Sequence, residues 1–403
     1  MSSTTKPWTV RARRAPILVR AMDATLRSLN RVGVFDSRLR LEALLEEAQE
    51  KSSLREWGGI SFREPLSLLL QDMQTLPLTA FGRFAARETF LQALTNRLEF
   101  VDASSHLPDE SPALEQPIFV LGLHRTGTTW LQELLAADPK NRTFRFFELV
   151  RPARPDRQRA RVALFANRRL SPEMKFVHPI QVESPEECWA LFMSTFAVVN
   201  YALHFDIPNY ERWLLSANLS YAYEEYRTQL RLLLGSSNDQ RVVLKCPEHL
   251  WCLRDLFSVF PRARIVWLHR DPLRSIASYS SLSALNRRAL MGEVDFESVG
   301  PDIARKFANG VHRAMSAREN ASSLQFCDVT YAELRRDPLR TVERIYARFE
   351  LPFSAEARSG MQALAMREKA PPHVYSASQY GVNESEVRTQ FAEYVNAYAV
   401  PLE

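Results

Sequence analysis

Residues that build tight turns, disulfides and zinc sites are scarce in this sequence. Only 12 of the 403 residues are glycine, about 3% against a usual ~7%, which argues against an all-β fold with many turns. The four cysteines include no CxxC pair, so the sequence predicts no zinc site and favours a reduced, cytoplasmic setting. The basic N-terminus also lacks the apolar core of a signal peptide.

Excess charge is limited as well. Lys and Arg number 52 against 47 Asp and Glu, which leaves a net charge of +5. This excess suits a small anionic ligand and is too weak to predict a nucleic-acid partner. Nine arginines nevertheless gather between residues 142 and 169. A solvated basic face and the steering of an anionic substrate both explain them.

The longest apolar run, Trp189 to Phe205, covers 17 residues, short of the ~20 that a membrane-spanning helix needs. It also contains Ser194, Thr195, Asn200 and His204. The run predicts a buried helix or the wall of an apolar pocket. Membrane contact is left open but not favoured, and the sequence leaves oligomerisation open.

The hydrophobic pattern changes near residue 115. Residues 1–115 show helical periodicity, and the segment 106–117, with three prolines, is expected to be a linker. Beyond it, strand-like runs at 117–122, 241–245, 263–269 and 324–329 each precede a helical stretch. This alternation predicts an α/β domain over 116–403, with a parallel sheet flanked by helices, after an N-terminal helical region at 1–115. Such sheets bind ligands beyond the carboxyl ends of their strands.

A glycine-containing turn follows the first expected strand. Gly122 and Gly127 are five residues apart in GLHRTGTTW, which predicts a loop whose backbone N–H groups surround an anion at a helix N-terminus. The spacing matches the start of the nucleotide-binding loop GxxxxGK[ST], but Thr128 stands in place of the lysine. An anion cradle is therefore favoured over an ATP-hydrolysing site.

The heptapeptide HRTGTTW at 124–130 resembles the 5′-phosphosulfate loop of sulfotransferases that use 3′-phosphoadenosine 5′-phosphosulfate (PAPS), written PKSGTTW or PRSGTT. The resemblance implies that this P-loop-like turn binds the donor through Arg125, Thr126, Gly127, Thr128 and Thr129, with Trp130 beside the adenine. The segment 267–278 is similar to the family's 3′-phosphate segment, which implies that Arg270 and Ser278 bind that phosphate.

Two further segments extend the resemblance. Residues 329–338 resemble the segment whose tyrosine, here Tyr331, approaches the adenine. Residues 372–381 resemble a C-terminal segment of the bacterial branch, which implies that Tyr380 and Gly381 help to close over the donor. Because the motifs occur in the family's order, each of the first three beside an expected strand, the resemblance covers about residues 115–400.

The resemblance implies an enzyme that transfers a sulfuryl group from PAPS to a hydroxyl or amine of a small-molecule acceptor, releasing 3′-phosphoadenosine 5′-phosphate (PAP) and using no metal. The apolar run suits an apolar or lipid-like acceptor. Two alternatives remain open: a nucleotide kinase or NTPase with a degenerate loop, and a non-catalytic binding protein on the same fold.

The resemblance also suggests catalytic groups. Arg125 and Lys245, which ends a strand, are the expected cations. Cytosolic relatives place the histidine base two residues after this lysine, where this chain has a proline. Glu148 after the loop's helix is the leading candidate for the general base, followed by His249 and by the pair His178 and Glu183. Glu186 and Glu187 are expected to cap the apolar helix instead.

Overall fold

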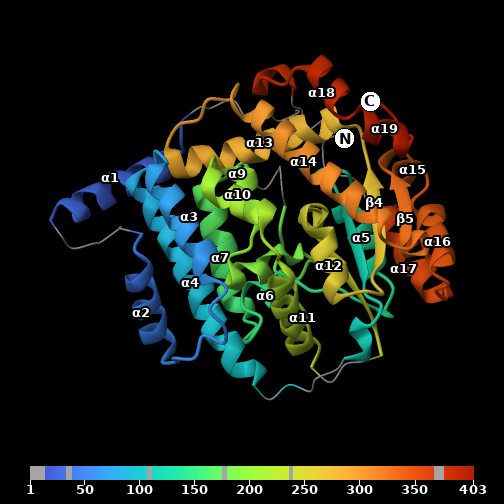
Figure 1. The fold of residues 1–403 in the computed structure, drawn as a ribbon, viewed down its shortest axis with the longest axis horizontal. Helices are drawn as coiled ribbons and strands as arrows, with labels where there is room; N and C mark the ends of the chain where they lie inside the picture. Colours follow the sequence, from blue (N-terminus) through green and yellow to red (C-terminus); the bar gives the residue numbers. More distant parts are fainter. Residues whose placement is uncertain are drawn as a thin grey trace, which may run out of the picture.

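A five-stranded parallel sheet lies at the centre of the computed structural model, which describes residues 14–32, 39–105, 107, 111–174, 179–235, 239–366 and 376–403. Its strand order is β2-β3-β1-β4-β5, and every neighbouring pair is parallel. Helices lie on both sides of the sheet (Figure 1). The strands are β1 (Ile118–Gly122), β2 (Asn141–Arg142), β3 (Arg241–Lys245), β4 (Arg264–His269) and β5 (Phe326–Thr330).

Helices form most of the remaining structure. The first part of the chain contains α1 (Ile17–Arg31), α2 (Leu41–Ser52), α3 (Arg63–Thr75), α4 (Ala80–Ser104), η1 (Pro112–Leu114), α5 (Thr128–Ala136), α6 (Phe146–Val150) and α7 (Arg157–Leu170). The middle contains η2 (Cys188–Thr195), α9 (Val199–His204), α10 (Pro208–Ser216), α11 (Ser220–Leu234), η3 (Pro247–Cys252), α12 (Leu253–Val259), α13 (Pro272–Met291) and α14 (Val299–Glu319). The last part contains η4 (Ser323–Gln325), α15 (Tyr331–Arg336), α16 (Pro338–Arg348), α17 (Ala355–Ala365), η5 (Ser378–Tyr380), α18 (Glu384–Gln390) and α19 (Ala392–Ala397).

Residues of β1 alternate between two separate hydrophobic cores. Phe119 and Leu121 belong to the larger core, whereas Ile118 and Val120 belong to a second one that includes side chains of α5, α16 and α17. Both faces of the strand are therefore buried, which is why it reads as an uninterrupted apolar run. The predicted α/β class with a helix-covered parallel sheet is confirmed.

Some boundaries differ from those expected. The helical stretch expected after the strand-like run 241–245 is divided into η3 and α12, and β5 begins at Phe326 because η4 precedes it. The short strand β2 was not expected, since two residues carry no periodic signal.

The N-terminal helices share a core with the sheet. The larger core runs without a break from Leu44 in α2 through Leu98 in α4 to Phe119 in β1. Arg97 of α4, only 1% exposed, donates to both carboxylate oxygens of Glu225 in α11 at 2.6 and 2.9 Å. The expected division near residue 115 stays a prediction.

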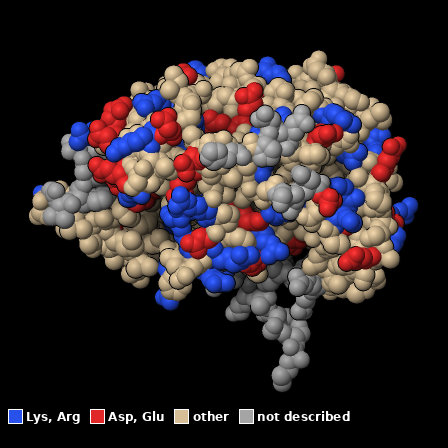
Figure 2. Space-filling model, turned by 90° about the horizontal axis from the view of Figure 1, so that it is seen from below, with Lys and Arg blue, Asp and Glu red and all other residues tan. Residues whose placement is uncertain are grey.

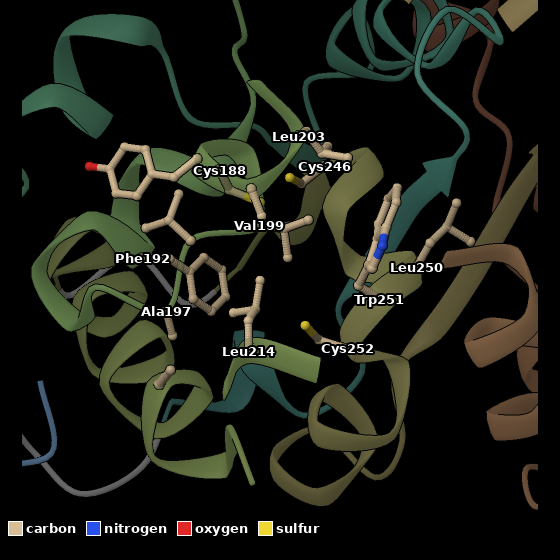
Figure 3. Packing of buried hydrophobic residues seen from close by; sticks show 14 of the residues in the cluster. Cys188, Phe192, Ala197, Val199, Leu203, Leu214, Cys246, Leu250, Trp251 and Cys252 are labelled. Carbon is tan, nitrogen blue, oxygen red and sulfur yellow. The ribbon is translucent and has the colours of Figure 1, made fainter. Parts of the chain in front are cut away.

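The apolar run 189–205 forms two short helical segments. The chain turns at Phe196, whose φ is +57°, between η2 and α9. Figure 3 shows Phe192 and Val199 from this region in one packed cluster with Cys246 and Trp251. Among the described residues, no helix has both the length and the apolar character needed to cross a membrane. Figure 2 shows a face on which basic and acidic side chains are interspersed, in keeping with the small net charge.

Candidate functional site

The loop between β1 and α5 has a backbone shape that glycine adopts readily. Gly127 has φ +94°, and a Cβ there would lie 2.9 Å from a ring carbon of Tyr331. Arg125 also has a left-handed φ of +70°. The hydroxyl of Thr126 donates to the carbonyl of Leu123 at 2.7 Å and braces the turn. The turn leads into the N-terminus of α5, a position suited to an anion.

Four of the predicted donor-binding residues meet beyond the carboxyl ends of three strands. The Nε of Arg125 donates to the hydroxyl of Ser278 at 3.1 Å. Arg270, which follows β4, donates to the backbone carbonyl of Arg125 at 2.9 Å. Its guanidinium lies 4.1 Å from the ring centre of Tyr331, which follows β5. The structure therefore assembles a basic cluster from residues that lie up to about 200 positions apart in the sequence.

A carboxylate already occupies the fork of Arg270. The Nε and one terminal nitrogen of Arg270 donate to the two side-chain oxygens of Glu403 at 2.9 and 2.8 Å. The backbone N–H of Glu403 donates to Asp271 at 2.9 Å, and Arg388 binds the same aspartate. This fork thus accepts a bidentate anionic group.

Arg125 and Arg270 of this basic cluster lie on the wall of a cavity of about 1270 Å³. The predicted donor-binding residues that line it are Arg125, Gly127, Thr128, Thr129, Trp130, Arg270 and Tyr331, whereas Ser278 and Thr126 are not among the described lining residues. Apolar lining comes from α6, η2, α13 and the residue directly after α9, through Phe146, Leu149, Trp189, Ala190, Phe205, Leu282 and Leu290. The prediction that the 189–205 run forms a pocket wall is therefore confirmed.

Lys245 is fully buried beside this cavity. Its Nζ donates to Oε1 of Glu187 at 2.8 Å and to the hydroxyl of Thr129 at 3.3 Å. Burial by itself lowers the pKa of Lys245, but the negative charges of Glu187 and Glu186 outweigh this effect and raise it. Lys245 therefore carries its charge at neutral pH, and it links the loop helix α5 to the start of η2.

Glu187 was not expected among the functional residues. Although it directly precedes η2, its side chain makes no capping hydrogen bond among the described residues, and it binds Lys245 at the cavity wall instead. The expectation that it caps a helix is wrong. The sequence contained one signal for this role: two glutamates directly precede an apolar run. A carboxylate that is buried with such a run needs a cation beside it.

Glu248 is a second buried carboxyl group behind the same wall. One of its oxygens accepts the backbone N–H of Asn200 at 3.0 Å, and Asn200 lines the cavity. Burial, followed by the charge of Glu187, raises the pKa of Glu248 to about 8. The group is therefore mostly protonated at pH 7 and adds little negative charge beside Glu187.

Glu148, the leading candidate for the base, makes structural contacts. Its carboxylate accepts from the guanidinium of Arg142 at 3.2 Å and from the backbone N–H of Arg145 at 2.7 Å, at the start of α6. Its neighbours Phe146 and Leu149 line the cavity, whereas Glu148 is not among the described lining residues. The geometry thus gives Glu148 a helix-capping role.

The other expected base candidates lie away from the cavity. His249 is buried, with Nδ1 2.8 Å from the hydroxyl of Tyr223 and Nε2 3.4 Å from the sulfur of Cys188. It borders a separate void of about 20 Å³. Glu183 is exposed and pairs with Arg145 and Arg157. His178 lies outside the described residues.

The C-terminal pair expected to close over the donor packs elsewhere. Tyr380 is 1% exposed, with its ring centre 5.8 Å from that of Phe296. A Cβ on Gly381 would lie 2.1 Å from the carbonyl oxygen of Glu297. Neither residue is among the described lining residues of the cavity. Residues 372–375 of this segment lie outside the described part of the chain.

Comparisons with known proteins agree with this architecture. The model of the sulfotransferase family matches residues 117–355, more than half of the chain. The chain is 23% identical over 326 residues to omega-hydroxy-beta-dihydromenaquinone-9 sulfotransferase Stf3 of Mycobacterium bovis, covering 75% of this chain and 81% of that protein. The same protein of Mycobacterium tuberculosis matches equally.

Two crystal structures are similar along nearly their whole length. Sulfotransferase STF9 from Mycobacterium avium superimposes with a TM-score of 0.80 at 27% identity, covering 92% of this chain and 99% of that one. Sulfotransferase STF1 from Mycobacterium tuberculosis gives a TM-score of 0.76 at 30% identity, covering 89% of this chain and all of the other.

The raised pKa of Glu248 predicts a pH-dependent stability that Glu248→Gln abolishes. Between pH 5 and 8 the unfolded wild-type chain loses this proton while the folded chain retains it. As the pH rises over this range, the free energy of unfolding of the wild type should therefore fall relative to that of Glu248→Gln by up to about 1.4 kcal/mol per pH unit. Urea unfolding of both proteins at several pH values measures the difference. Parallel profiles would show that the carboxyl group titrates normally.

Proposed function

The chain belongs to the sulfotransferase family and is a sulfotransferase enzyme, and we propose that it transfers a sulfuryl group from PAPS to a hydroxyl of an apolar, lipid-like acceptor. One observation carries the proposal: Arg125, which is hydrogen-bonded to Ser278, and Arg270 lie together on the wall of a cavity that is otherwise largely apolar. A single cavity thus offers an anion site and an apolar site.

The donor end fits the chemical groups of PAPS. Arg270 and Ser278 would hold the 3′-phosphate, since Arg270 already binds a carboxylate through two nitrogens. The loop from Thr126 to Thr129 would hold the 5′-phosphosulfate at the N-terminus of α5. The rings of Trp130 and Tyr331, both at the cavity wall, are available to the adenine.

The acceptor end fits a molecule with a long apolar part. A matched relative is named for a hydroxylated menaquinone, a lipid-like substrate. Here the walls formed by Trp189, Phe205, Leu282 and Leu290 offer apolar contact over the same cavity. We therefore assign this chain an apolar small-molecule acceptor that presents a hydroxyl group to the basic end.

Glu187 is our candidate for the general base. It lines the cavity, and Lys245 and Thr129 connect it directly to the donor loop. The donor supplies a sulfuryl group with PAP as leaving group. The acceptor oxygen forms a bond to sulfur, the sulfur bond to the phosphate oxygen breaks with its electron pair remaining on PAP, and Glu187 takes the acceptor's proton. Lys245 and Arg125 stabilise the negative charge on the transferring group and the leaving group.

This proposal replaces the kinase and the binding-protein alternatives. Thr128 occupies the place of the lysine that binds the γ-phosphate in nucleotide triphosphatases, so the loop suits a donor without that group. We also propose a cytoplasmic location, supported by four buried free thiols in the described chain.

If Arg270 and Ser278 bind the 3′-phosphate, PAP should bind about 30- to 1000-fold more tightly than AMP, which lacks that phosphate. Arg270→Ala should abolish most of this preference and leave AMP affinity nearly unchanged. Isothermal titration calorimetry with both nucleotides measures the effect. Equal affinities of the unmodified protein for PAP and AMP would contradict the donor assignment.

The carboxylate of Glu403 must leave Arg270 before a phosphate binds there. Glu403→Ala should therefore raise PAP affinity by up to about fivefold, which corresponds to about 1 kcal/mol for an exposed ion pair. AMP affinity should stay the same. Glu384→Ala is the matched control, because Glu384 lies in the same C-terminal region and pairs with Arg388 instead. An equal gain in both variants would point to general loosening of this region.

Glu187→Gln should lower turnover by about 10²–10⁴, the usual effect of removing a general base, while PAP affinity stays near that of the wild type. The amide keeps an oxygen for Lys245, so the fold should persist. Glu148→Gln serves as the control and should leave turnover nearly unchanged. The assignment fails if Glu187→Gln remains active while Glu148→Gln loses turnover and still binds PAP. That result would identify Glu148 as the base.

A further inference from the structure

Exposed hydrophobic side chains concentrate on two neighbouring helices. Ten large hydrophobic residues are exposed in the described chain, and six of them lie on or directly after α1 or on α7: Ile17, Leu18, Leu29, Val32, Val162 and Phe165. Their exposed fractions reach 77% for Ile17, 63% for Val162 and 61% for Phe165. Scattered exposed hydrophobic residues are normal, whereas a gathering on adjacent helices indicates an interaction surface.

On α7 these side chains share the outward side of the helix. Ala160 and Leu164 are buried and face the protein, whereas Val162 and Phe165, three residues apart, are exposed on the opposite side. Arg169 follows Phe165 on the same side, and its guanidinium lies 4.9 Å from the centre of the Phe165 ring.

The exposed charges on these two helices are positive. The sequence of α7, RQRARVALFANRRL, contains five arginines and no acidic residue. On α1 the single acid, Asp23, is buried, where it pairs with Arg27 and accepts the backbone N–H of Phe81 at 3.1 Å. Within the described chain, Arg161 and Arg169 form no ion pair. Arginines around exposed apolar side chains are the composition of helices that lie on anionic membranes.

The two helices lie next to the cavity. They pack against each other, and Val19 of α1, Leu170 of α7 and Leu290 of α13 belong to one small hydrophobic cluster. Leu290 and Asn167 of α7 also line the cavity. Helix α7 therefore forms part of the cavity wall, and α1 packs against α7.

We propose that the outward faces of α1 and α7, the α1/α7 surface, dock on an anionic lipid bilayer and place the apolar end of the cavity beside the membrane. Exposed apolar side chains enter the headgroup region, and the arginines bind the anionic headgroups. A lipid-like acceptor then reaches the cavity without crossing water. The delivery of a lipid-like acceptor rests on the proposed function, whereas the binding of this surface to lipid does not.

Sedimentation with vesicles tests the proposal on the full-length protein. The wild type should bind vesicles of 30% phosphatidylglycerol in phosphatidylcholine, and bind them less at high salt, while pure phosphatidylcholine vesicles should bind little. The double variant Arg161→Gln/Arg169→Gln should bind about 10- to 30-fold more weakly, since each basic residue contributes about fivefold. Val162→Ser/Phe165→Ser should also bind more weakly.

Leu324→Ser is the control, because Leu324 is 71% exposed and lies in η4, whose three residues include no arginine. All variants should keep the PAP affinity and the melting temperature of the wild type, which shows that their folds are intact. Absence of binding to anionic vesicles overturns the proposal, as does binding that both double variants retain. Dimerisation that Val162→Ser/Phe165→Ser abolishes, without vesicle binding, would assign the surface to a second copy of the chain. If the wild type does not bind PAP, the donor assignment is refuted, whereas the vesicle measurement still tests the membrane proposal.

Discussion

The buried charge of Lys245 is the constraint around which the site is organised. An ammonium group with no exposure to solvent is costly unless an opposite charge and hydrogen-bond acceptors surround it. Glu187 provides the charge and Thr129 a second oxygen, so the end of β3, the start of η2 and the N-terminus of α5 must meet at one place. Truncation of either side chain would leave the other buried without its main partner.

The same ion pair controls the protonation of its surroundings. The charge of Glu187 and burial together raise the pKa of Glu248 to about 8, so a second carboxyl group is accommodated largely in its neutral form. Lys245 stays charged although it is buried. The region thus combines a buried cation, the carboxylate paired with it and a largely neutral acid.

The cavity combines two kinds of wall. Its basic part contains Arg270, which is held in place by Tyr331, by the carbonyl of Arg125 and by the carboxylate of Glu403. Its apolar part includes Leu290 of α13, which packs in one hydrophobic cluster with side chains of α1 and α7.

The sequence by itself determined the fold class and four of the five strands, because these depend on local patterns: apolar runs, glycine spacing and short motifs. It placed Arg125, Arg270, Ser278 and Tyr331 after the correct strands. Only the tertiary structure decided which carboxylates line the cavity, Glu133, Glu186 and Glu187 among them. Lys245 and Glu187 are 58 residues apart, and Arg270 and Glu403 are 133 apart, so no local pattern specifies either pair. Glu148 suited a base by its place after the loop's helix, yet Arg142 and a helix N-terminus hold it, because the burial of each charge is settled by the side chains that the fold brings around it.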